Sequence, residues 1–229
     1  MPDLSFPLTR SRIEEDLLAY LEGEGTSQSR TPTARYASFD YCFNYFQSFR
    51  DQGDIPLLAS PERMEQSCLQ LGFYLASWGM LRGSSALLQH SSKSLEPLIS
   101  ALAITPQPLW EIDANSYTDD RIHALLDQGS SLRRLIPGGA SDTLITKVML
   151  GVFGSVPAFD TLFKRGLGVA TFGPKALRAV SRFYTEFADL IEKYRVPTLG
   201  FNSGSPTTRL YTRAKVIDMI FFIEGSRSS

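Results

Sequence analysis

Apolar side chains recur at every third or fourth position along most of the chain, a spacing that places them on one face of an α-helix. Phe39, Phe43 and Phe46 form one such face. The alternating polar and apolar pattern of β-strands is nearly absent, and no internal repeat is found. These features predict an all-α fold, a compact helical body of about eight to ten helices.

Capping and breaking residues predict where the helices begin and end. Ser60 precedes Pro61 at one expected helix start, and the dipeptide Gly173-Pro174 opens a long helix. Segments 23–33 and 196–209 are rich in Gly, Ser and Thr and are expected to be loops. The expected helices cover residues 9–22, 36–49, 60–81, 84–102, 119–134, 141–152, 160–165, 173–194 and 211–224. A chain of 229 residues is long enough for one well-packed domain, so we expect a single all-α domain over residues 1–229.

Composition excludes several classes of protein. Hydrophobic residues make up 43% of the chain and the net charge is −1, so the chain can build a core and is not disordered. Cys42 and Cys68 are too few for a disulfide framework or a four-cysteine cluster, and their apolar contexts predict buried free thiols. With only two histidines available as ligands, His90 and His123, we expect no metal site and no cofactor, and we assign neither histidine a role.

Targeting features are also lacking in the sequence. The first residues, MPDLSFPLTRSRIEEDLL, carry acids where a signal peptide has an apolar core. No run approaches the roughly 18 consecutive apolar residues of a membrane span. We therefore expect a cytoplasmic protein with no membrane partner, and no obligate protein partner is evident.

The charge is distributed unevenly. Residues 129–182 contain eight Lys and Arg side chains but only two acids, so the segment has a net charge of +6 and the rest of the chain −7. Such an asymmetry suggests a basic face for a polyanion, although a solvated surface with no partner is the alternative.

A glycine-rich turn lies inside this basic segment. The run LIPGG, residues 135–139, stands between two predicted helices, and a turn of this kind exposes backbone N–H groups to an approaching phosphate. After the second helix, Asp160 stands at the start of a short basic helix.

This order of elements resembles the helix–hairpin–helix superfamily of DNA glycosylases. Residues 136–140, IPGGA, resemble the L-P-G-V-G hairpin of that family, and residues 159–165, FDTLFKR, resemble its V-D-T-H-V-x-R catalytic element. The separation of hairpin and aspartate fits without an insertion. The resemblance implies a helix–hairpin–helix catalytic part over about residues 119–229, joined to an N-terminal helical part over about residues 1–118.

The resemblance further implies hydrolysis of the N-glycosidic bond of a flipped, damaged or modified base in double-stranded DNA, with Asp160 as the key carboxylate. A carboxylate there stabilises positive charge on the sugar and orients water, whereas the alternative role of Asp160 is a plain helix N-cap. Some members of the superfamily act against bacteriophages, so a hypermodified phage base is included among the expected substrates. The residues expected to contact DNA are Gly138, Gly139, Lys147, Lys164 and Arg165.

The chain departs from the family pattern at two positions. Ala140 replaces the second hairpin glycine, and Asp142 stands where members that also cleave the backbone carry a lysine. Lys147 lies five residues further along the same helix, which is a different face, so we predict a monofunctional enzyme that forms no Schiff base. The four-cysteine iron–sulfur loop of some members is absent from the sequence.

Four residues are candidates for a base pocket or for a wedge that fills the gap left by a flipped base. Trp78 and Arg82 lie beside an expected helix break at Gly79 and Gly83, and a buried core position is the alternative for Trp78. Asp40 and Asn44 share one side of an aromatic helix, where a solvent-facing stripe is the alternative. Asp218 interrupts an apolar run and is expected to pair with a Lys or Arg.

Two functions of other classes remain open. The chain is alternatively a non-catalytic DNA-binding protein whose hairpin grips phosphates, or an all-α interaction domain whose basic segment is an incidental surface.

Overall fold

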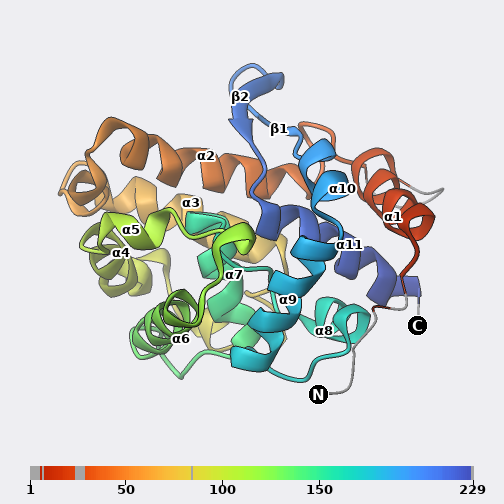
Figure 1. Ribbon diagram of the computed structural model, residues 1–229. Helices are drawn as coiled ribbons and strands as arrows, with labels where there is room; N and C mark the ends of the chain where they lie inside the picture. Colours follow the sequence, from red (N-terminus) through yellow and green to blue (C-terminus); the bar gives the residue numbers. More distant parts are fainter. Residues whose placement is uncertain (1–5, 7, 24–28, 84, 228–229) are drawn as a thin grey trace.

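The computed structural model describes residues 6, 8–23, 29–83 and 85–227 and confirms the all-α fold class. The described residues form eleven α-helices, four short 3-10 helices and one two-stranded antiparallel sheet (Figure 1). The α-helices are α1 (Arg10–Glu22), α2 (Ala37–Gln52), α3 (Met64–Ser77), α4 (Glu96–Ala103), α5 (Gln107–Trp110), α6 (Asp119–Arg133), α7 (Asp142–Phe153), α8 (Thr161–Leu167), α9 (Pro174–Glu186), α10 (Ala188–Lys193) and α11 (Arg213–Arg227). The remaining elements are η1 (Ile55–Ala59), η2 (Ala86–Gln89), η3 (Ser92–Leu95), η4 (Ala114–Ser116), β1 (Pro197–Leu199) and β2 (Pro206–Leu210).

Two helices organise the packing. The last helix, α11, packs against α8, α1, α9 and α10, while α2 packs against α7 and α3 (Figure 1). The buried apolar side chains form one continuous cluster that extends from Leu8 to Ile223. Cys42 and Cys68 are free and buried in this cluster, as predicted. In the described part of the chain, no helix combines the length and apolar character needed to cross a membrane.

The number of helices exceeds the expected eight to ten because of two local features. The four-residue helix α5 has Pro108 in its first turn and was not predicted. The helix expected over residues 173–194 is divided into α9 and α10, since Phe187 leaves helical geometry with φ −120° and ψ 29°.

Three further expectations about local structure were wrong. The helix expected over 60–81 begins only at Met64, and its N-cap is Arg63 rather than Ser60. The helix expected over 84–102 is replaced by η2, η3 and α4; its expected start, Ser84, lies outside the described residues, as do 1–5, 7, 24–28 and 228–229. The Ser94 hydroxyl donates to the Ser91 carbonyl oxygen at 2.8 Å, a local bond that competes with a continuous helix. The loop expected over 196–209 contains the hairpin β1–β2, paired from Pro197 with Leu210 to Leu199 with Pro206.

Helix α8 lies unusually close to α11. A Cβ atom added to Gly225 of α11 would collide with the Leu162 carbonyl oxygen of α8, and one added to Gly166 of α8 would collide with the Phe221 carbonyl oxygen. The two glycines therefore allow direct contact between the helix backbones. This contact fixes the position of α8, whose first residue follows Asp160.

Candidate active site

Asp160 lies where the link after α7 enters α8. Gly154 ends α7 in a left-handed conformation with φ +65°, and the chain then crosses to α8 through Pro157. The Asp160 carboxylate accepts a hydrogen bond from the Phe163 backbone N–H at 2.9 Å, so it is the N-cap of α8. Its other oxygen lies 3.2 Å from the Lys147 ammonium. Capping accounts for one carboxylate oxygen and leaves the second one facing an amine.

Lys147 lies inside the molecule rather than on a surface that could contact phosphates. Every residue of α7 from Leu144 to Phe153 is buried, and the Lys147 side chain is 4% exposed. Its ammonium lies 4.8 Å from the centre of the Trp78 ring and forms an ion pair with Asp160. The residue is on a different face from Asp142, as predicted, but that face is directed at Asp160.

Trp78 caps the C-terminal end of α3 and is half-buried. Its ring stacks on Tyr36 with an interplanar angle of 6° and a centroid separation of 5.6 Å. The indole Nε1 is buried and has no hydrogen-bond partner among the described residues. Trp78 therefore belongs partly to the core and partly to the site.

A second buried ion pair lies on the same cavity. Asp218 pairs with Lys215 at 2.8 Å, which confirms the expected Lys or Arg partner. Lys215 also donates to the Tyr20 hydroxyl at 2.9 Å. Burial lowers the pKa of Lys215, but the oxygens of Asp218 and Tyr20 outweigh that effect and raise it above its ordinary value.

The cavity between these groups is small. Its volume is about 10 Å³, enough for about one water molecule. A nucleobase does not fit unless the site opens. The cavity is lined by Tyr74, Trp78, Lys147, Leu150, Ala158, Asp160, Lys215, Asp218 and Phe222.

The connection between α6 and α7 holds the predicted phosphate-binding turn. Gly138 and Gly139 are exposed, and their φ values of +75° and +80° are ones that glycine adopts without strain. The Gly139 N–H already donates to the Ile136 carbonyl oxygen at 3.2 Å. That this turn is a DNA-binding hairpin stays a prediction.

Asp142, at the position of the missing lysine, closes this connection. It accepts hydrogen bonds from the Arg133 guanidinium at 2.6 Å and from the Phe172 backbone N–H at 3.0 Å. Partial burial raises the pKa of Asp142, but these two bonds outweigh it and hold the pKa below its usual range. Asp142 therefore has a structural role as an acceptor at the start of α7.

The two basic residues of α8, Lys164 and Arg165, differ in their exposure. Lys164 is half-buried and forms no hydrogen bond or ion pair with the part of the chain that the structure describes. Arg165 is exposed and donates to the Gly225 carbonyl oxygen at 3.2 Å. Both stay predicted DNA contacts.

Three expected pocket residues lie elsewhere. Arg82 is exposed and folds back over Gly79. Asp40 is fully buried, so the alternative of a solvent-facing stripe is wrong; it pairs with Arg30 at 2.8 Å and accepts from the Leu199 N–H. Asn44 donates to the Leu199 carbonyl oxygen at 2.9 Å. Asp40 and Asn44 fasten β1 to α2, and none of the three lines the cavity.

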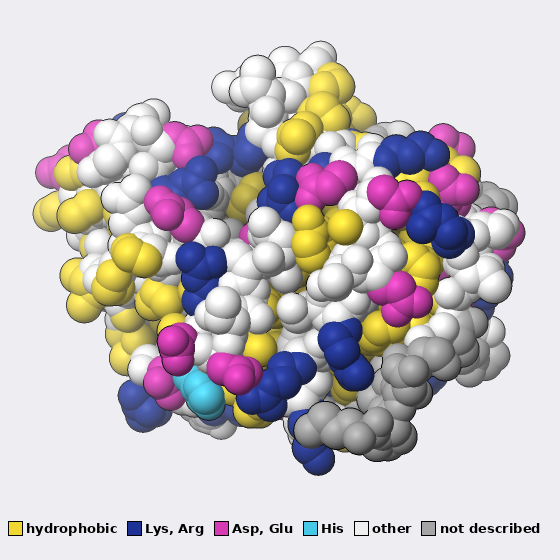
Figure 2. Space-filling model, viewed as in Figure 1, with side chains coloured by type: hydrophobic (Ala, Val, Ile, Leu, Met, Phe, Trp, Pro, Cys, Tyr) yellow, Lys and Arg dark blue, Asp and Glu magenta, His cyan; other side chains and the backbone are white. Residues whose placement is uncertain are grey.

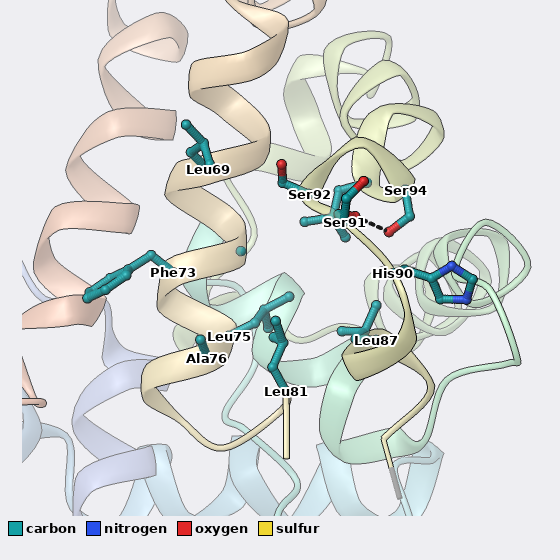
Figure 3. A pocket seen from close by; sticks show the side chains of 12 residues that line it. Leu69, Phe73, Leu75, Ala76, Leu81, Leu87, His90, Ser91, Ser92 and Ser94 are labelled. Atoms are coloured by element: carbon teal, nitrogen blue, oxygen red, sulfur yellow. Dashed lines mark hydrogen bonds between the residues drawn. The ribbon is translucent and has the colours of Figure 1, made fainter. Parts of the chain in front are cut away.

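A larger hollow lies between α3 and the segment of η2 and η3 (Figure 3). Its volume is about 250 Å³ and its lining is mainly apolar, with Leu69, Phe73, Leu81 and Leu87 among the contributors. His90 and three serines complete the lining, and none of the described residues around it is a Lys, Arg, Asp or Glu. The hollow offers no carboxylate or amine for bond cleavage, so the cavity at Asp160 is the better candidate for an active site.

The sequence did not predict that Lys147, Lys215 and Asp218 would share a cavity with Asp160. A signal was present, because each of the three is a charged residue within an otherwise apolar helical run. Their convergence depends on how α7 and α11 pack, which the spacing within either helix does not contain. Among the described residues, no group of three His, Cys, Asp or Glu side chains is arranged to hold a metal ion.

Comparison of the chain with protein-family models, with curated proteins and with solved structures finds no match.

Proposed function

We propose that the chain is a monofunctional DNA glycosylase that hydrolyses the N-glycosidic bond of a flipped, damaged or modified base in double-stranded DNA. The observation that supports this best is the Asp160 carboxylate, which caps α8, keeps 18% of its side chain exposed and faces a cavity that it shares with Trp78. The proposed DNA substrate agrees with the expected cytoplasmic location, and a hypermodified phage base remains within the substrate class.

The carboxylate of Asp160 would act by charge. When the base leaves with the bonding electron pair, positive charge develops on the sugar, and a fixed carboxylate stabilises it. Water then adds to the sugar carbon and gives a proton to the carboxylate. The Phe163 N–H and the Lys147 ammonium each hold one Asp160 oxygen, so the carboxylate needs little reorganisation during the reaction.

Base binding requires the cavity to open. Trp78 is the side chain on the cavity wall that is best placed to move, because it ends α3 and precedes Gly79, whose φ is +77°. Its buried Nε1–H gains no hydrogen bond from the described residues in the closed state. We expect a flipped base to displace the indole and to stack on the neighbouring aromatic rings.

The position of Lys147 favours one second candidate, a glycosylase with lyase activity. A deprotonated Lys147 amine would displace the base from the sugar carbon and pass a proton to the departing base. Opening of the sugar ring, with a proton transferred from the nitrogen to the ring oxygen and a second proton retained, would then give the iminium that precedes strand cleavage. The observation behind this candidate is the 3.2 Å separation of the Lys147 amine from Asp160.

The test uses duplexes that carry single damaged or hypermodified bases, followed by hot alkali to cut abasic sites. Asp160→Asn should lower the rate of base release on the order of 10²- to 10³-fold, because Asn keeps the cap to Phe163 but loses the charge. The double variant Lys147→Met/Asp160→Asn, which leaves no unpaired buried ammonium, should lose the same activity. Undiminished release by both variants would show that the mechanism is wrong.

Borohydride separates the two candidates. The monofunctional enzyme yields no covalent adduct with DNA, whereas the lyase yields an adduct that Lys147→Met abolishes. Retention of DNA without release from any duplex would favour the non-catalytic DNA-binding alternative, and no retention would favour the interaction domain.

A further inference from the structure

The segment between α7 and α8, which ends at Asp160, is held by side chains of α7 and α11. The Ala158 N–H donates to an Asp218 carboxylate oxygen of α11 at 2.9 Å. The Phe159 N–H donates to the Thr146 hydroxyl of α7 at 2.8 Å, and the Thr143 hydroxyl donates to the Phe159 carbonyl oxygen at 2.9 Å. The two residues before Asp160 are therefore fixed in position from both sides.

Burying the Asp218 carboxylate in order to hold this segment costs desolvation free energy. The Asp218 side chain is 9% exposed, and its second oxygen accepts from the Lys215 ammonium, whose side chain is 1% exposed. The ammonium is surrounded by rings, 4.7 Å from the centre of Tyr20 and 4.9 Å from that of Phe39. Replacing a buried ion pair of this kind by apolar side chains is often neutral or stabilising, so stability alone does not account for it.

We infer that Asp218 is a positioning residue for Asp160, acting through the Ala158 N–H, and that Lys215 holds the Asp218 side chain in place through its second oxygen. The inference rests on the proposed function for its catalytic consequence. Ala158 is two residues from Asp160, so a loosened Ala158 shifts the carboxylate relative to the sugar. A misplacement of about 1 Å at a reacting centre can cost on the order of 10²-fold in rate.

Asp218 lies on the same cavity as Asp160, yet the geometry separates their roles. Both Asp218 oxygens are engaged within the protein, one by a backbone N–H and one by a fully buried ammonium. Asp160 is the more exposed carboxylate, 18% against 9%. Asp160 therefore meets the substrate, and Asp218 acts through the loop.

The test compares two double variants that differ only in the hydrogen-bond acceptor. Lys215→Met/Asp218→Asn removes both charges and keeps an oxygen for the Ala158 N–H, while Lys215→Met/Asp218→Leu removes the acceptor as well. In single-turnover base release, the Leu double should be slower than the Asn double on the order of 10²-fold, with equal DNA affinity. Equal rates in the two doubles would overturn the inference, as would a loss that appears only in DNA affinity.

Amide hydrogen exchange of the free protein tests the same inference and does not require base release. Exchange at Ala158 should be faster in the Leu double than in the Asn double, while the amides of α4 report any change in global opening. Exchange at Ala158 that is equal in the two doubles would show that Asp218 does not hold the loop. If the wild-type protein releases no base from any duplex, the proposed function fails. The hydrogen-exchange measurement at Ala158 still decides whether Asp218 holds the segment before Asp160.

Discussion

Asp16 of α1 is fully buried, and neither of its carboxylate oxygens accepts a hydrogen bond from the described residues. Three charged groups surround it: Arg227 at 3.2 Å and Arg12 at 3.8 Å, with Glu224 of α11 bonded to the same Arg12. Burial raises the pKa of Asp16 to about 7, since the two arginines recover only part of the lost hydration and Glu224 opposes them.

A pH dependence of stability follows from Asp16. The unfolded chain releases this proton near pH 4, whereas the folded chain keeps it until about pH 7, so the contribution of Asp16 to stability falls as the pH rises between these values. Urea unfolding of the wild type and of Asp16→Asn should show the wild type losing stability relative to the variant from pH 5 to pH 8. A difference that stays constant or grows with pH would contradict the raised pKa.

Residue types were easier to predict than residue partners. The sequence predicted that Asp160 stands at a helix start and that Asp218 needs a cationic partner, because both features depend on neighbours within a few positions. The pairing of Lys147 with Asp160 and of Asp40 with Arg30 and β1 depends on long-range packing. Apolar periodicity places a residue on a buried face without saying which side chain it meets there.

At the scale of the elements, the position of α8 is set by its close contact with α11. Its backbone touches that of α11 at Gly225, and its first residue follows Asp160. The position of the carboxylate therefore depends on a helix contact in which Gly225 lets the two backbones meet directly.

Gly225→Ala should push α8 away from α11, because the added methyl meets the Leu162 carbonyl oxygen, which cannot rotate aside. We expect a loss of about 1–3 kcal/mol in the free energy of unfolding, measured in urea, and a lower rate of base release. Gly72→Ala in α3 is the matched control: its nearest neighbour would be Leu95 Cδ1 at 3.5 Å, so alanine there should stabilise the protein by up to about 1 kcal/mol. If Gly225→Ala is as well tolerated as the control, the helix contact does not hold α8.

The elements that the sequence missed are those with weak local patterns. Long helices such as α2, α6 and α7 were predicted within a few residues of their observed ends. The hairpin β1–β2 was not predicted, because its residues are equally typical of a loop. Hydrogen bonds between Leu199 of β1 and the side chains of Asp40 and Asn44 in α2 stabilise it. Such stabilisation by a helix that is distant in the chain cannot be inferred from the sequence of the hairpin itself.

At the scale of the whole molecule, composition and periodicity predicted a helical body with a continuous core, and the structure has one. The positive excess of residues 129–182 is less concentrated in space than in the sequence. Arg133 and Arg178 are paired with Asp142 and Asp119, and on the face shown in Figure 2 basic side chains are interspersed with acidic ones. A DNA surface, if it follows the resemblance, therefore rests on few cations.

Lys164 is the cation with which this surface is best tested, because it stands on α8 beside Asp160 and its side chain forms no hydrogen bond or ion pair with the described residues. Loss of one phosphate contact reduces the slope of log K against log salt concentration by about 0.9 for duplex DNA. Lys164→Gln should therefore flatten the salt dependence of DNA retention by about that amount and weaken binding about equally for all duplex sequences. Lys93→Gln, which removes an exposed lysine of η3 that pairs with Glu96, is the matched control and should leave the slope unchanged. Identical slopes for the wild type and both variants would remove α8 from the DNA-binding surface, and with it the phosphate anchor that the proposed reaction places beside Asp160.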